Sequence, residues 1–271
     1  MIFMFLTMAL GGVVGLTLGL MGGGGTILAI PFLVYILDQS ASQAVGISLA
    51  TVGVTSLVGA LERIWAGEAD VGPALSVRLA GMMTAPVGTW IGRGIAPDLL
   101  MNMFVVLMFM IALRSWQNAK GKSAEEARFE EEKISAPACR YAPTGSIQMT
   151  SRCTFALVLA GLVVGMVSGL FGVGGGFIIV PALIFAAQMP VDRAVGTSLV
   201  VISMVSFSGL ISIIFSRTEI PIAITVWFIL GSLSGLYLGT KYSRKMEGTG
   251  QQKVFAVEVG IATVFMIVQN N

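Results

Sequence analysis

Charge is scarce in this sequence: Asp, Glu, Lys and Arg make up 11% of its 271 residues, whereas an average soluble domain carries about 25%. There is no histidine, and the only two cysteines, Cys139 and Cys153, lack the spacing of metal ligands. We therefore expect no metal, no cofactor and two free thiols in or near a reducing cytosol. The net charge of +2 gives no reason to expect a nucleic-acid partner.

Motifs for nucleotide binding and catalysis are missing as well. No G-x-x-x-x-G-K-S/T motif is present, so ATP is not expected as the direct energy source. Without histidine, a reactive cysteine or paired carboxylates inside the apolar runs, we find no catalytic constellation and expect a protein that is not an enzyme. The N-terminal MIFMFLTMALGG lacks the basic region and cleavage site of a signal peptide, so it predicts a first membrane segment.

Long hydrophobic runs dominate what is present. Hydrophobic residues make up 55% of the chain, and most of the runs are near the ~20 residues that cross a bilayer core. The runs cover residues 3–20, 43–61, 99–113, 154–171, 194–215 and 220–240. These lengths predict an all-α polytopic membrane protein that is embedded in the lipid bilayer.

The chain contains two copies of one unit. The stretch GGVVGLTLGLMGGGGTILAIPFL, which starts at Gly11, aligns without a gap with GLVVGMVSGLFGVGGGFIIVPAL, which starts at Gly161. Chance similarity between two apolar segments would preserve hydrophobicity but not the positions of glycine and proline. The alignment predicts an N-terminal membrane repeat at 1–115, a polar cytoplasmic linker at 116–152 and a C-terminal membrane repeat at 153–271.

Each repeat holds about five apolar segments, of which the second is too short to span a bilayer. It covers residues 26–37 in the first copy and 176–188 in the second, follows a glycine-rich break and contains a proline. A broken or re-entrant half-helix is predicted, and whether it fully crosses is left open. Basic residues gather in the linker and at 241–253, which favours a cytoplasmic location for both. Both can be cytoplasmic only if each repeat crosses an odd number of times, which predicts inverted topology.

The contiguous glycines predict an anion site. Irregular backbone at membrane depth is tolerated only where it is buried in protein or lines a wet cavity. Bare glycine amides at the start of a helix can approach an anion closely. The spaced glycines Gly11, Gly15 and Gly19, like their counterparts from Gly161 onward, instead predict close helix packing.

Hydroxyl and charged side chains complete the predicted site. The pairs Ser48/Ser198 and Ser56/Ser206 recur in both copies, although single hydroxyls on spanning helices often bond their own backbone. The predicted substrate-binding residues are Gly23, Gly24, Gly25, Thr26, Ser48, Thr51, Gly174, Gly175, Gly176, Thr197, Ser198 and Arg78, with Glu258 as the proton-coupling candidate. Arg78 could instead snorkel to the headgroups and Glu258 could be solvated. Glu62 and Arg63, at a segment end, are expected to pair or to face water.

The duplicated block resembles a known family. The pattern G-x-x-x-G-x-x-x-G-x-G-G-G-x-x-x-x-P-x-L, nearly repeated at 11–33 and followed in the second copy by AVGTSL, is similar to that of the TauE/SafE family. The resemblance implies a multi-pass carrier in a prokaryotic inner membrane that exports small anions such as sulfite, sulfoacetate and related sulfonates. Some members carry a C-x-x-C pair, which this sequence lacks.

The leading hypothesis is a secondary anion transporter with alternating access, in which one repeat rocks against the other around a site made by both glycine breaks. The alternative is a passive anion channel with a glycine-lined constriction. The expected partners are a small anion and a coupling proton or cation, and assembly as a homodimer is left open.

Overall fold

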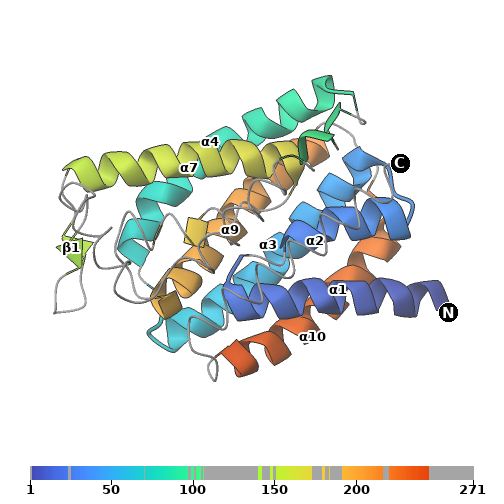
Figure 1. Cartoon of the computed structure of the whole chain (residues 1–271), viewed down its shortest axis with the longest axis horizontal. Helices are drawn as coiled ribbons and strands as arrows, with labels where there is room; N and C mark the ends of the chain where they lie inside the picture. The colour runs from blue at the N-terminus through green and yellow to red at the C-terminus, as the bar shows by residue number, and fades with distance from the viewer. Residues whose placement is uncertain are drawn as a thin grey trace.

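The computed structural model describes residues 2–23, 26–69, 71–96, 99–100, 102–104, 106, 140–141, 147–148, 151–172, 179–180, 183, 191–215 and 220–243. This part of the chain is almost entirely helical (Figure 1). The elements are α1 (Ile2–Met21), α2 (Thr26–Pro31), the π-helix η1 (Phe32–Ile36), α3 (Ala41–Trp65), α4 (Val71–Gly94), α7 (Ser151–Phe171), α9 (Val191–Phe215) and α10 (Ile222–Ser243). Two short strands between α4 and α7, β1 (Arg140–Tyr141) and β2 (Ile147–Gln148), pair antiparallel.

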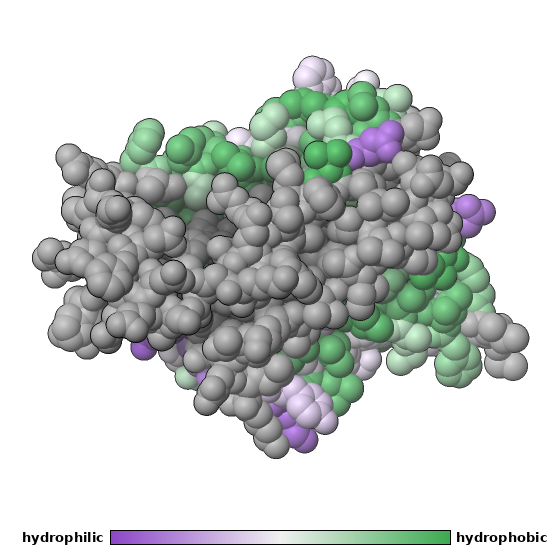
Figure 2. Space-filling view, viewed as in Figure 1, coloured by the Kyte–Doolittle hydropathy of each residue, from purple (hydrophilic) through white to green (hydrophobic). Residues whose placement is uncertain are grey.

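In the part of the chain that the structure describes, four helices are long and apolar enough to cross a membrane: α1, α3, α9 and α10. The prediction of an all-α polytopic membrane protein is therefore confirmed. These four helices differ in burial: 72% of the spanning window of α3 is buried, compared with 39% of that of α10. The outer helices α1, α4, α7 and α10 expose large apolar side chains, which Figure 2 shows over the α4–α7 pair and along α1. Exposed apolar side chains of this kind are suited to contact with lipid.

Helices α3 and α9 form the centre of the bundle and run antiparallel. Gly53 of α3 lies against Ser206 of α9, and Gly59 lies against Leu199, so the residue numbers rise along one helix as they fall along the other. The start of α3 is therefore level with the end of α9. Figure 1 shows the two helices crossing the middle of the molecule between the outer pairs.

Two parallel helix pairs flank this centre, and glycine brings their backbones into contact. The first pair is α1 and α10, where Gly11, Gly15 and Gly19 lie in order against Phe228, Ser232 and Leu236. The second pair is α7 and α4, where Gly161, Gly165 and Gly169 lie in order against Val77, Gly81 and Ala85. At each of these glycines a Cβ would come within 3.0 Å of the facing backbone, so only glycine permits this approach. The packing interpretation of the spaced glycines is confirmed.

The helix contacts exchange between the predicted repeats. The packing of α1 on α10 is matched by that of α7 on α4, and the packing of α3 on α10 is matched by that of α9 on α4. In each outer pair one helix comes from each repeat. The repeats are thus interlocked rather than placed side by side.

The short second segment is present where the sequence predicts it. Together α2 and η1 cover eleven residues, about 16 Å at the rise of an α-helix, which is too short to span a bilayer core. Pro31 has no N–H to donate within the helix, and the π-turns begin directly after it. Ile27, Ala29 and Leu33 are fully buried. The counterpart at 176–188 lies mostly outside the described residues.

Candidate functional site

The first glycine break begins at Gly22, where α1 ends. Gly22 has a φ of 71°, a left-handed conformation that favours glycine, and its N–H donates to the carbonyl of Leu18 at 2.8 Å. The hydroxyl of Ser198 on α9 lies 2.9 Å from the carbonyl oxygen of Gly22 and 2.8 Å from that of Val195 in its own helix, so its one O–H is shared between the two acceptors. A Cβ on Gly22 would lie 2.6 Å from Cγ1 of Val195, so this break is pressed against the other repeat. We call the Ser198–Gly22 contact the first clamp.

The second glycine break repeats this arrangement with the repeats exchanged. Gly172, at the end of α7, has a φ of 68°, and its N–H donates to the carbonyl of Ser168 at 2.8 Å. The hydroxyl of Ser48 on α3 donates to the carbonyl of Gly172 at 2.7 Å. A Cβ on Gly172 would lie 2.8 Å from Cα of Val45. We call the Ser48–Gly172 contact the second clamp.

The two clamps are apart from each other. Leu199, the neighbour of Ser198 in the first clamp, packs against Gly59, so the first clamp lies at the level of Gly59 along α3. The second clamp lies at the level of Ser48. About 12 residues of α3 separate the two levels, or roughly 18 Å. The sequence interpretation put both breaks in one site, but their described residues form two contact regions at different heights in the bundle.

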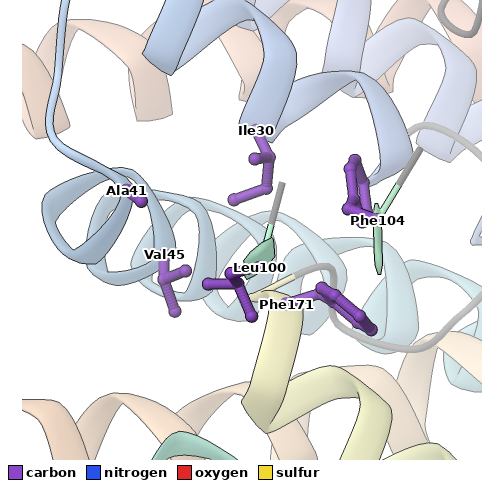
Figure 3. Close-up of a pocket in the computed structure, with 6 residues that line it drawn as sticks. All are labelled: Ile30, Ala41, Val45, Leu100, Phe104 and Phe171. Carbon is purple, nitrogen blue, oxygen red and sulfur yellow. The ribbon is translucent and has the colours of Figure 1, made fainter. Parts of the chain in front are cut away.

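The surroundings of the second clamp are apolar. Next to it is a small hollow lined by Ile30, Ala41, Val45, Leu100, Phe104 and Phe171, whose side chains Figure 3 shows. The rings of Phe104 and Phe171 are 5.4 Å apart between centroids. Beside it, a Cβ on Gly46 would touch the side chains of Ile220 and Ile213. Among the described residues, no polar side chain lines this hollow.

The surroundings of the first clamp contain a buried cation that the sequence interpretation missed. Arg63 in the last turn of α3 is 2% exposed, and its Nη1 lies 3.0 Å from Oε2 of Glu68. Its Nη2 lies 3.4 Å from Oγ of Ser243, which in turn donates to the carbonyl of Leu20 at 3.1 Å. Leu20 precedes the first break by two residues, so the guanidinium lies close to this break.

The Nε–H of Arg63 is buried and has no acceptor among the described residues. A buried donor of a charged group without an acceptor costs at least about 1–3 kcal/mol. Glu62 and Arg63 were expected to pair or to face water; Arg63 does not face water, and its ion-pair partner is Glu68. A signal was present in the sequence, because the ungapped repeat alignment pairs Arg63 with the apolar Ile213.

The remaining predicted hydroxyls fall into two groups. Ser56 bonds the carbonyl of Val52 in its own helix, which is the local pairing common for hydroxyls in spanning helices. Thr51 and Ser206 are buried, and their hydroxyl oxygens have no hydrogen-bond partner among the described residues. The same holds for Ser168 of α7, which was not among the predicted residues. Buried hydroxyls without partners are unusual in packed interiors, and they identify polar positions between the helices.

The other predicted site residues are only partly described. Gly23 and Thr197 are buried near the first clamp, and Thr26 begins α2. Arg78 is in the second turn of α4, and its side chain lies outside the described residues. The predicted site residues that lie outside the described part of the chain are Gly24, Gly25, Gly174, Gly175, Gly176 and Glu258. The structure therefore brings Gly23 and Ser198 to one end and Ser48 to the other.

Comparisons with known proteins give a consistent result. A family model described as sulfite exporter TauE/SafE matches residues 7–266. A probable membrane transporter protein of Xylella fastidiosa is 31% identical over 97% of this chain and 95% of its own length. A probable membrane transporter protein of Methanocaldococcus jannaschii is 25% identical over 97% and 94%, and one of Bacillus subtilis named YunE is 26% identical over 88% of each chain. No solved structure matches the chain.

Proposed function

Because the chain belongs to the TauE/SafE family of membrane transporters, we propose that it is a secondary transporter that exports small anions, such as sulfite or organosulfonates, by alternating access. It is a multi-pass membrane protein, and its bacterial relatives point to the inner membrane. The observation that carries the proposal is the pair of clamps, in which a serine of one repeat holds the broken helix end of the other. Broken helices at a repeat interface are typical of substrate sites in secondary transporters.

Helix directions support inverted repeats in this proposal. Helix α10 ends beside the ends of α1 and α3, since Ser243 contacts Leu20 and Arg63. Helix α4 begins just after α3 ends, and α7 runs parallel to α4, so α7 begins at this same end. The linker that precedes α7 and the basic stretch that follows α10 are therefore both at this end. We assign this end, with the first clamp, to the cytoplasmic side.

In the proposed mechanism the two clamps are gates. The first clamp is in the cytoplasmic half, and the second is roughly 18 Å away toward the start of α3. This separation lets one clamp open while the other stays closed. Between them, Thr51 and Ser206 supply buried hydroxyls without partners among the described residues. An O–H group can donate a hydrogen bond to an anion that passes between the gates.

Proteoliposomes that contain the purified full chain test the transport reaction. The expected result is saturable uptake of radiolabelled sulfite that is accelerated by unlabelled sulfite or methanesulfonate on the opposite side. Such counterflow requires a site that faces each side in turn. Flux that rises linearly with concentration and shows no counterflow would support the channel instead, and repetition across pH reports coupling to protons.

Labelling of single cysteines tests the topology. In a chain without Cys139 and Cys153, we expect Lys241→Cys to react with a membrane-impermeant maleimide only from the cytoplasmic side, because Lys241 is exposed in the last turn of α10. Asp38→Cys, in the exposed turn before α3, is expected to react only from the outside. Labelling of both positions from one side would contradict the proposed orientation of the repeats.

A further inference from the structure

We propose that Arg63 binds the transported anion at the first clamp through the edge of its guanidinium formed by Nε and Nη2. This inference rests on the proposed function. It gives the substrate site a cation that the sequence interpretation did not place there. It also names the substrate class as an anion with two neighbouring oxygens, such as a sulfonate, sulfite or carboxylate.

Arg63 is placed at the first clamp by a chain of contacts between elements. Its partner Glu68 packs through its backbone carbonyl against Gly196 of α9, where a Cβ would have no room. Gly196 adjoins Val195, which touches Gly22. On the opposite side, Ser243 links Arg63 to the last turn of α1. The guanidinium therefore lies where α1, α3, α9 and α10 meet.

The hydrogen bonds of the guanidinium leave one edge available. Glu68 takes Nη1 at 3.0 Å and so fixes the orientation of the group. Nη2 has a long contact of 3.4 Å to Ser243, and Nε has no acceptor among the described residues. The N–H bonds of Nε and Nη2 on this edge are parallel, and their spacing matches two oxygens of one carboxylate or sulfonate. A single spherical anion such as chloride meets both N–H bonds only if both bend toward one point, so it fits this edge less well than a pair of oxygens does.

A purely structural role explains Arg63 less well. A cation in the last turn of a helix is favourable for the helix dipole, and the ion pair with Glu68 ties α3 to the next loop. Both effects need only the charge and Nη1, and neither uses Nε. The second repeat has Ile213 at the aligned position, where it is 3% exposed. The second repeat therefore has an apolar side chain at the aligned position, and among the described residues the cation is found beside the first clamp and not beside the second.

Burial of Arg63 fits the proposed gating. With 2% of the residue exposed, the free edge is closed to solvent in the conformation described. An anion reaches it only when the contact of the Gly22 region with Ser198, or that of α10 with Arg63, is released. Glu68, at 31% side-chain exposure, holds the guanidinium from the solvent side and is a positioning residue.

The test compares Arg63→Lys, Arg63→Gln and the control Lys241→Gln in proteoliposomes that contain the full chain. Lysine keeps the charge and can still pair with Glu68, but it lacks the two-donor edge. The measured quantities are the KM for sulfite counterflow and the inhibition by methanesulfonate relative to chloride. We expect both Arg63 variants to raise the KM roughly tenfold to hundredfold and to lose the preference for methanesulfonate. Lys241→Gln, an exposed change, is expected to behave as wild type.

Each outcome decides the proposal. A wild-type KM and an unchanged anion preference in Arg63→Lys would overturn it, because charge alone would then suffice. If Arg63→Gln does not fold, Arg63→Lys decides by itself. If the wild-type protein shows no flux of any anion, the proposed function fails. The Arg63 site is then judged by the sulfite-dependent rise in Tm: a rise in wild type that is lost in Arg63→Lys supports the site, and equal shifts in both overturn it.

Discussion

Replacement of Gly15 by alanine is the sharpest test of the interlocked packing. Gly15 of α1 faces the carbonyl of Ser232 on α10, and a Cβ there would come well within the 3.0 Å limit that real Cβ atoms respect. Gly12, nearly one turn earlier in the same helix, provides a matched control because its Cβ would lie 3.7 Å from the carbonyl of Gly231, an ordinary contact. The two substitutions are chemically identical and differ only in the space available.

The expected magnitudes follow from this geometry. Alanine gains up to about 1 kcal/mol over glycine within a helix, so Gly12→Ala is expected to be neutral or to stabilise by that amount. Gly15→Ala has the same gain, but it must push α1 away from α10, which costs about 1–3 kcal/mol or more because the obstacle is backbone. The difference between the two variants is therefore about 1–3 kcal/mol in the free energy of unfolding.

Unfolding of the purified variants in mixed detergent micelles measures this difference. Counterflow of sulfite in proteoliposomes then reports whether separation of α1 from α10 also disturbs the first clamp, which lies at the end of this helix pair. Equal stability of Gly15→Ala and Gly12→Ala would refute the close approach of the two helices and, with it, the exchange of outer helices between the repeats.

Two further predictions concern the clamps. Gly22→Ala combines a left-handed φ of 71° with overlap on Val195, whereas Gly67→Ala has a φ of 70° in open space. We expect about 1–2 kcal/mol of destabilisation for Gly67→Ala and about 1–3 kcal/mol more for Gly22→Ala by thermal unfolding, and equal losses would exclude the overlap. Ser198→Ala removes a hydroxyl shared between the carbonyl of Gly22 in the other repeat and that of Val195 in its own helix. It is expected to destabilise by about 0.5–1.5 kcal/mol and to weaken the apparent affinity for sulfite. Ser203→Ala, whose hydroxyl bonds only its own helix at Val200, is expected to change neither quantity, and similar values for both serines would remove the clamp from the mechanism.

The sequence was sufficient to predict the features that depend on length and on residue size. Runs of apolar residues predicted the spans, the proline and the glycine break predicted the short α2–η1 segment, and the spaced glycines predicted close packing. The sequence could not show which helices the glycines face, because partners such as Gly15 and Ser232 are far apart in the chain. For the same reason it could not show that Ser198 and Ser48 each bond the opposite repeat.

Arg63 was misjudged for a related reason. A charged residue two positions before the end of a spanning helix usually reaches water, and no local feature distinguishes one that turns inward. Its burial depends on Ser243 at the end of α10 and on Glu68 in the following loop. The informative comparison was between the repeats, since Ile213 occupies the aligned position.

The difference between the repeats bears directly on how such a molecule could work. Two identical clamps would give the anion the same environment at both ends, and neither end would retain it better than the other. Here the first clamp has a guanidinium beside it and the second has Ile213, Ile220 and the hollow at Phe171. An anion bound at Arg63 would meet an apolar second clamp on its way out, and that clamp offers it no competing cation among the described residues. The anion is therefore bound at the first clamp and is not bound at the second. This arrangement favours release of the anion through the second clamp over its rebinding there.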